Sequence, residues 1–217
     1  METDGLNKTP PAVRPADGEI QDDGSMKSEE TNFIRVTNIA NLFTDFTSIP
    51  ADVLAAAAKR GKDVHRLCEA YLSGLIVSGY PAAYEGYLDS FKTWAKDNIV
   101  EIFEMETRRY CQTHMITGQI DLLVKLKDID GLTLVDLKTS SAKHRSWDIQ
   151  LGGYRYLLRE TEPTNFVSNA MTLRLRKDGS KAIPNMVDSL AQAESIFFSA
   201  LHCYKFLKLK PKTIEVE

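Results

Sequence analysis

The sequence predicts a single mixed domain of the α/β or α+β class. Apolar residues recur at helical spacing before residue 97 and after residue 146, whereas residues 99–138 alternate or form short apolar runs typical of strands. The expected order is three helices, three strands, one helix, two strands and a terminal helix. A length of 217 residues with 43% hydrophobic residues is enough for one domain with its own core.

The N-terminal segment differs from the rest in composition. It is rich in Pro, Asp, Gly and Glu and has few large apolar residues. Residues 1–30 hold eight acidic and three basic residues, a net charge of −5, so the remaining chain carries +2 against a total of −3. We therefore expect residues 1–31 to form a disordered acidic tail and residues 32–217 to form one mildly basic domain.

Helices are expected ahead of the first strand. A short helix should end near Phe43, and longer helices are expected over residues 51–59, 61–75 and 81–96. In the helix over 61–75, His65 and Glu69 are four residues apart and share one flank. Taken alone, His65 is more simply explained as an imidazole at the edge of the core that makes one hydrogen bond.

Two apolar strands joined by a turn form the centre of the prediction. A strand over 99–111 is followed by strands over 120–124 and 132–138, and the Asp130-Gly131 pair between the latter two is typical of a hairpin turn. These apolar strands carry Asp121, Asp136 and Lys138, and buried charges need a partner or a metal.

Asp136 and Lys138 are two residues apart, so both face one side of their strand. If Asp121 faces the same way, two carboxylates and an ammonium group meet in one place. Carboxylates side by side repel each other unless a divalent cation lies between them, and oxygen ligands suit Mg²⁺ or Mn²⁺. The simpler alternative is that Asp136 and Lys138 form a surface pair.

The second half of the chain returns to helix and strand. A polar loop that contains Lys143 and Arg145 precedes a helix over 147–159, in which Gln150 and Tyr154 share a face. The paired glycines of this helix, at 152–153, allow either close approach of a backbone or simple packing on the sheet. Strands over 170–176 and 181–186 and a helix over 187–207 complete the chain.

Cysteine usage and hydropathy exclude several classes of protein. Cys68, Cys111 and Cys203 are scattered, which argues against a zinc site or a disulfide framework and supplies too few thiolates for an all-cysteine iron–sulfur cluster. No stretch approaches the length of a membrane span, and no apolar signal core is present at the N-terminus. We therefore expect a cytoplasmic protein without membrane contact.

The order of these motifs resembles the PD-(D/E)XK nuclease superfamily, specifically its RecB-like exonuclease branch, which is widespread in phages. Asp121 is preceded by Ile120 rather than Pro, as is usual in this branch. The cysteine set of the iron–sulfur relatives is missing, so no iron–sulfur cluster is expected. The matching residues are Gly61-x-x-x-His65, Glu106, Gly118-x-x-Asp121, Asp136-x-Lys138-Thr139 and Gln150-x-x-x-Tyr154.

The resemblance implies a restriction-endonuclease-like core, with a central mixed sheet flanked by helices, and a role for each matching residue. Asp121 and Asp136 would bind Mg²⁺, with the carbonyl of Leu137 and the imidazole of His65 as further ligands. Lys138 would orient or activate the attacking water. Glu106 would support the metal site or the sheet. The residues that would position Lys138 or the DNA backbone are Thr139, Lys143, Arg145, Gln150 and Tyr154.

The activity implied is that of a metal-dependent DNA exonuclease of phage or prophage recombination, repair or replication. A single-strand annealing or single-strand-binding protein is an implied partner, and assembly into a homo-oligomer is compatible with the resemblance. Two alternatives stay open: a catalytically silent DNA-binding or assembly subunit, and a structure-specific or restriction-type endonuclease. The complete set of Asp121, Asp136 and Lys138 argues against silence, and the absence of a separate target-recognition domain argues against sequence-specific cutting.

Overall fold

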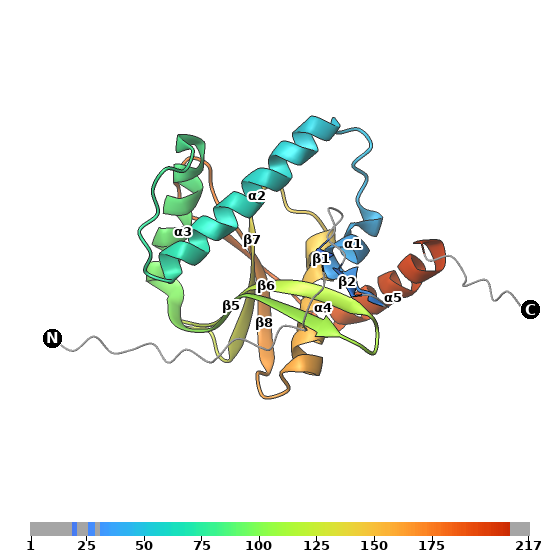
Figure 1. Ribbon diagram of the computed structural model, residues 1–217. Helices are drawn as coiled ribbons and strands as arrows, with labels where there is room; N and C mark the ends of the chain where they lie inside the picture. Colours follow the sequence, from blue (N-terminus) through green and yellow to red (C-terminus); the bar gives the residue numbers. More distant parts are fainter. Residues whose placement is uncertain (1–18, 21–25, 29–30, 209–217) are drawn as a thin grey trace, which may run out of the picture.

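The structure, a computed structural model, describes residues 19–20, 26–28 and 31–208 (Figure 1). Most of the predicted disordered tail lies outside the described residues. Its described pieces form a small antiparallel sheet of three short strands, which the composition did not predict. These strands are β1 (Glu19–Ile20), β2 (Met26–Ser28) and β3 (Thr31–Asn32).

The main sheet is mixed, as predicted. Its strands run in the order β5-β6-β7-β8-β9, with the pairs β7–β8 and β4–β6 parallel and the other pairs antiparallel. The bounds of β5 and β7 agree with those predicted from the alternation and the Asp-Gly turn. The strands are β4 (Ile34–Arg35), β5 (Ile99–Cys111), β6 (Ile116–Leu126), β7 (Leu132–Lys138), β8 (Val167–Arg174) and β9 (Ile183–Met186).

Helices cover both faces of this sheet. Figure 1 shows α2 and α3 on one side and α1, α4 and α5 on the other, and each side has its own apolar core. None of the helices in the described part of the chain has the length and hydropathy needed to cross a membrane. The helices are α1 (Val36–Ala40), η1 (Asn41–Phe43), α2 (Ala51–Leu72), η2 (Ala82–Tyr84), α3 (Glu85–Asn98), α4 (Ser146–Thr161) and α5 (Leu190–Lys208).

Helix α2 corrects one prediction. The expected helices over 51–59 and 61–75 are a single helix of 22 residues that continues through Gly61. An interior glycine costs a helix about 1 kcal/mol, which is too little to break it when packing holds the flanking turns. Val64, Leu67 and Cys68 supply that packing, since all three are buried against the sheet. The unbroken helix places His65 over the middle of the sheet.

An unpaired stretch on one edge of β6 creates space for a site. Strand β5 pairs with β6 along its length on one edge. The other edge is shared by β4, which pairs with Ile116 and Thr117, and by β7, which pairs with residues 122–125. Residues 118–121 therefore have no strand partner on this edge among the described residues, and Asp121 lies at the point where β6 and β7 separate.

Two glycines allow the helix α4 to pack closely between the sheet and α5. A Cβ on Gly118 would lie 2.6 Å from the ring of Tyr154, and a Cβ on Gly152 would lie 2.4 Å from the main chain of Ala193. The expectation that the glycine pair of α4 lets another backbone approach is therefore confirmed for Gly152, whereas Gly153 faces the side chains of Phe197 and Val36. Gly118 brings the Gln150 and Tyr154 face of α4 against the site.

Candidate active site

The main chain of Leu137 joins two groups of polar side chains. Its N–H donates to Oδ2 of Asp121, 2.7 Å away, and its carbonyl oxygen lies 3.0 Å from Nε2 of His65. Both contacts lie at the end of β7, where the ladder to β6 has stopped at the Leu122–Val135 pair. Polar backbone groups that lose their strand partner thus find side chains from β6 and α2 instead.

The first group consists of one imidazole and two carboxylates. Nδ1 of His65 lies 3.4 Å from Oδ1 of Asp121 and 3.6 Å from Oε1 of Glu106. One ligand atom from each of these residues lies within 4.8 Å of the other two. Glu106 also accepts a hydrogen bond from the side chain of Gln119. This arrangement differs from the simpler explanation of His65, an imidazole with one hydrogen bond at the edge of the core.

The backbone of Glu106 is distorted within β5. Its φ is +49°, in the left-handed region that a glutamate rarely adopts. Such a conformation costs on the order of 1–3 kcal/mol and is found where surrounding structure enforces it, often at functional sites. The distortion falls opposite the unpaired edge of β6, and the Glu106 side chain reaches His65. From the sequence, Glu106 was expected to support either the metal site or the sheet, and the structure places its carboxylate beside the side chains of His65 and Asp121.

Charge within this group is balanced by mutual attraction. Burial disfavours the imidazolium of His65, but the carboxylates of Asp121 and Glu106 outweigh burial and raise its pKa well above the usual value. Burial likewise opposes ionisation of Asp121, but His65, Lys138 and the N–H of Leu137 together lower the pKa of this carboxyl. The neighbouring carboxylates therefore favour the imidazolium form of His65 over the neutral ring.

The second group connects the end of β7 to α4. Nζ of Lys138 lies 2.6 Å from Oδ2 of Asp136 and donates to Oε1 of Gln150 at 3.0 Å. Nε2 of Gln150 donates to Oδ1 of Asp136 at 2.7 Å and lies 2.9 Å from the hydroxyl of Tyr154. Burial raises the pKa of Asp136 to about 6 and, more strongly, raises the pKa of Tyr154. The ring of Trp147 lies 5.8 Å from Nζ of Lys138 and covers it.

The predicted meeting of two carboxylates and an ammonium group is realised as two adjoining halves. Asp121 faces His65 and Glu106, whereas Asp136 faces Lys138 and Gln150, and the backbone of residue 137 connects them. Asp136 is 2% exposed, which contradicts the alternative of a surface pair. Lys138 lowers the pKa of Asp121, so the two halves act on each other electrostatically.

A groove of about 1130 Å³ opens onto both groups. Thr139 lies in its wall, 3.5 Å from Nε of Arg60, and His144 lines it. Lys143 and Arg145, predicted to position DNA, are exposed and do not line the groove; Lys143 instead lies 3.6 Å from Asp148.

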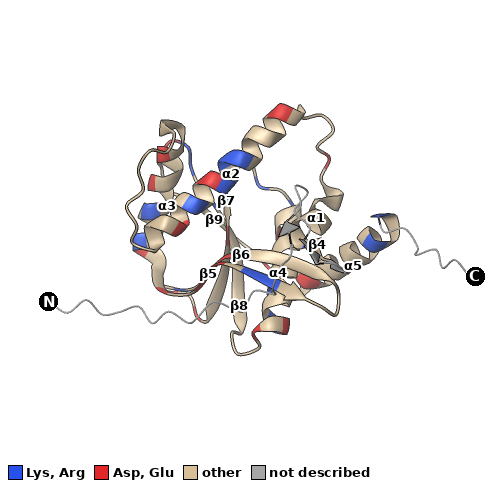
Figure 2. Cartoon of the chain, viewed as in Figure 1, with Lys and Arg blue, Asp and Glu red and all other residues tan. Residues whose placement is uncertain are grey.

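Several basic residues of the groove were not singled out from the sequence. They are Arg35 on β4, Arg60, Lys62 and Arg66 on α2, and Arg108 on β5. Figure 2 shows basic residues recurring along α2. A signal was present, because the three residues of α2 lie within five residues of His65. Their direction toward the groove depends on how α2 crosses the sheet, which no local pattern encodes.

The sequence profile of the PD-(D/E)XK nuclease superfamily matches residues 42–205, which is well over half of the chain. The chain belongs to the PD-(D/E)XK nuclease superfamily. No curated protein shows a significant match to this nuclease-superfamily chain.

Two solved structures are similar to this PD-(D/E)XK protein at low sequence identity. The crystal structure of SSO0001 has a TM-score of 0.47 and 15% identity, over 86% of this chain and 81% of that chain. A candidate exonuclease from Eubacterium rectale has a TM-score of 0.48 and 12% identity, over 84% of this chain and 91% of that chain. Both TM-scores lie below 0.5, so neither likeness supports a statement about activity.

PD-(D/E)XK nucleases use divalent metal ions, and the residues of this chain fit such an ion. His65, Glu106 and Asp121 offer three ligand atoms close together, and the carbonyl oxygen of Leu137 adjoins them. Oδ2 of Asp136 is buried, and its partner is the ammonium of Lys138, 2.6 Å away. Carboxylate and carbonyl oxygens gathered beside an imidazole are typical of a site for a divalent cation.

Proposed function

We propose that this protein is a metal-dependent deoxyribonuclease that removes nucleotides from DNA ends by hydrolysing phosphodiester bonds. The observation that carries the proposal is the joining of a His65–Glu106–Asp121 ligand group to a buried Asp136–Lys138 pair through the backbone of Leu137. A structural ion pair would not need the three further ligand atoms beside it. The arrangement supplies both metal ligands and a cation close to one point on the floor of a groove.

Each residue of the site has a role in the proposed reaction. His65, Glu106, Asp121, Asp136 and the carbonyl of Leu137 would hold Mg²⁺, or Mn²⁺ in its place. The metal, when bound, lowers the pKa of a water and offsets charge on the phosphate. Lys138 would orient the attacking water and stabilise the negative charge that develops on the phosphate. Gln150 would fix Lys138 and Asp136 relative to each other, as it does through its two hydrogen bonds.

Charge on the groove supports a nucleic-acid substrate. Arg60, Lys62, Arg66 and Arg108 line the groove around the acidic ligands. Phosphates of a DNA strand attract such side chains, whereas the carboxylates at the centre would repel a polyanion if no metal were present. The groove therefore favours DNA in its metal-bound form.

The exonucleolytic mode and the biological setting rest on the motif pattern. The histidine of α2 is the feature that the RecB-like branch adds to the Asp and Lys motifs. We place the enzyme in phage or prophage recombination, repair or replication, beside a single-strand annealing or single-strand-binding protein. Co-purification of that partner from cells that express the tagged nuclease would test this placement.

The decisive experiment is digestion of labelled DNA. Linear and closed-circular DNA, single- and double-stranded, would be incubated with Mg²⁺, Mn²⁺ or EDTA. Loss of linear DNA alone, blocked by EDTA, is the expected result, and the position of the surviving label gives the polarity. Nicking of closed circles would instead identify an endonuclease. Binding of DNA without any metal-dependent cleavage would identify a silent subunit and overturn the proposal.

A further inference from the structure

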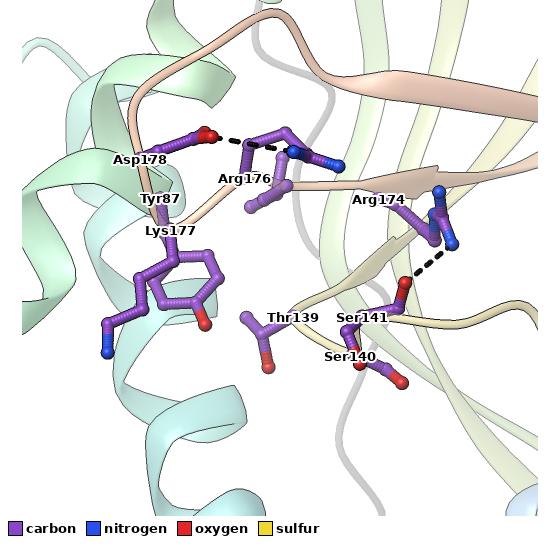
Figure 3. A pocket seen from close by; sticks show the side chains of 9 residues that line it. Tyr87, Thr139, Ser140, Ser141, Arg174, Arg176, Lys177 and Asp178 are labelled. Atoms are coloured by element: carbon purple, nitrogen blue, oxygen red, sulfur yellow. Dashed lines mark hydrogen bonds and ion pairs between the residues drawn. The ribbon is translucent and has the colours of Figure 1, made fainter.

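A second cavity adjoins the active-site groove. It has a volume of about 450 Å³, and residues 139–141 line both this cavity and the groove. Figure 3 shows Arg174 beside Ser141, Arg176 beside Asp178, and Tyr87 and Lys177 on the left of the view, with Thr139 and Ser140 below. The segment that follows the catalytic Lys138 is thus a wall common to two spaces.

Sheet geometry fixes this cavity next to the catalytic lysine. Arg174 is the register partner of Lys138 in the parallel ladder between β7 and β8. The N–H of Leu175 donates to the carbonyl oxygen of Lys138 at 2.8 Å, which fixes the register at this end. Neighbouring strands lie about 4.8 Å apart, so the main chain of Arg174 lies one strand away from Lys138.

The cavity has an excess of positive charge. Arg174 donates to the carbonyl oxygen of Ser141 at 2.8 Å, a neutral acceptor that leaves its charge uncompensated. Arg176 lies 3.4 Å from the carboxylate of Asp178, and both side chains of that pair are exposed in part. Lys177 adds a third cation and has no acidic partner among the described residues. Three cations against one carboxylate favour an anionic ligand.

The chemistry of the lining groups suits a phosphate. Guanidinium groups bind phosphate oxygens through paired N–H donors, and serine and threonine hydroxyls contact the phosphates of nucleic acids. Thr139 and Ser140 bring hydroxyls to the lining of the same cavity as Arg174. A DNA strand carries a phosphate at every nucleotide, so a strand that passes the catalytic site brings further phosphates to its surroundings.

We propose that this cavity binds a phosphate of the DNA strand other than the one being cleaved, with Arg174 as its principal ligand. The inference deepens the proposed nuclease function and rests on it. Binding there would fix the strand at a set distance from Lys138 and so select which bond is hydrolysed. The phosphate is either the terminal monoester of a DNA end or an internal diester, and these two sources are separated by the substrates below.

The test compares Arg174→Gln and Arg174→Lys with the wild type. Binding to a fluorescent oligonucleotide would be followed by anisotropy with Ca²⁺ in place of Mg²⁺, and cleavage would be measured separately with Mg²⁺. Lys125→Gln is the charge-matched control, since Lys125 is exposed on β6 and lines neither cavity. Thermal unfolding of each variant checks the fold, and Lys177→Gln, an exposed position, replaces Arg174→Gln if that variant does not fold.

Arg174→Gln removes one charged phosphate contact, so this variant should bind the oligonucleotide about tenfold more weakly than the wild type does. It should also reduce the slope of log K against log salt by about 0.7 to 0.9. Because the contact lies away from the reacting atoms, KM should rise with little change in kcat. Arg174→Lys should recover part of the affinity, and Lys125→Gln should behave as wild type.

The substrates then identify the source of the phosphate. A defect seen only with phosphorylated ends, and absent with hydroxyl ends, assigns the cavity to a terminal phosphate. An equal defect with both kinds of end assigns it to an internal phosphate. Wild-type affinity and KM in Arg174→Gln would overturn the inference while leaving the nuclease proposal intact. An Arg174-dependent affinity in a protein that cleaves no DNA would overturn the nuclease proposal and leave the phosphate site standing.

Discussion

The main-chain N–H of Leu137 donates to Oδ2 of Asp121 across the edge of β6 at which β7 has ceased to pair. A strand ladder normally satisfies such an N–H with a carbonyl oxygen. Here a carboxylate accepts the bond, and this contact helps to lower the pKa of Asp121. The separation of the two strands therefore both opens the site and gives the Asp121 carboxylate a buried donor that favours its ionised form.

Asp121 is both a candidate metal ligand and the acceptor for the N–H of Leu137, so two substitutions at this position should differ in stability. Asp121→Asn retains an oxygen acceptor for the N–H of Leu137, whereas Asp121→Ala leaves that buried donor without a partner. An unsatisfied buried donor costs about 1–3 kcal/mol, so the alanine variant should be less stable than the asparagine variant by that amount. Urea denaturation of both variants in EDTA measures the difference. Equal stabilities would show that water or another group satisfies Leu137.

The pair at the end of β7 should be essential for cleavage. Asp136→Ala and Lys138→Ala should each reduce the rate at least about a hundredfold, as removal of a transition-state contact does in other enzymes. Circular dichroism should show the wild-type fold, because both side chains line the groove. Lys125→Gln is the control for loss of a positive charge. Full activity in either alanine variant would refute the assignment of the site.

Metal binding should release a proton. The carboxylates of Asp121 and Glu106 raise the pKa of His65 despite its burial, so the imidazolium stabilises the metal-free fold below pH 6.5, and this contribution is lost as the pH rises through the folded pKa. A metal needs the neutral ring, so its affinity should increase with pH up to that pKa.

Calorimetry in buffers of different ionisation enthalpy counts the released protons directly. Mn²⁺ binding near pH 7 should release about one proton in the wild type, and close to none in His65→Gln. Asp136, with a pKa of about 6, should add a second proton only at lower pH. Proton release that is unchanged in His65→Gln would remove His65 from the ligand set.

Two glycines should respond to alanine in opposite ways. Gly118→Ala places a methyl group 2.6 Å from the ring of Tyr154, and overpacking of this kind destabilises a fold by about 1–3 kcal/mol. Gly61→Ala lies inside α2 with its nearest neighbour, Oγ1 of Thr139, 4.0 Å away, so helix propensity should stabilise the fold by roughly 0.5–1 kcal/mol. Denaturant titration of the two variants measures both effects, and a stabilised Gly118→Ala would contradict the close packing of α4.

Local sequence patterns were sufficient to predict most of the strands. The alternation over 99–111 and the Asp130-Gly131 turn are short-range signals, and β5 and β7 have the predicted bounds. The burial of Asp136 and its pairing with Lys138 also follow from one apolar strand. The break expected at Gly61 was wrong because burial of Val64 and Leu67 outweighs the preference of a single residue.

Features that depend on distant segments were not predictable. The unpaired edge of β6 exists because β4 and β7 share that edge, and the two strands are far apart in the chain. The left-handed backbone of Glu106 has no local signature such as glycine. Arg174 lies beside Lys138 only because β8 runs parallel to β7, so the cavity that it lines could not be predicted from the sequence.

Leu137 takes part in the site through its backbone alone. Its N–H and carbonyl contact Asp121 and His65, while its side chain is 2% exposed and packs in the core beneath α2 and α3. The identity of the residue between Asp136 and Lys138 is therefore determined by the shape of the interior. Over evolutionary time this position is free to drift among apolar side chains of similar volume without any loss of chemistry, while proline, which lacks the N–H, is barred.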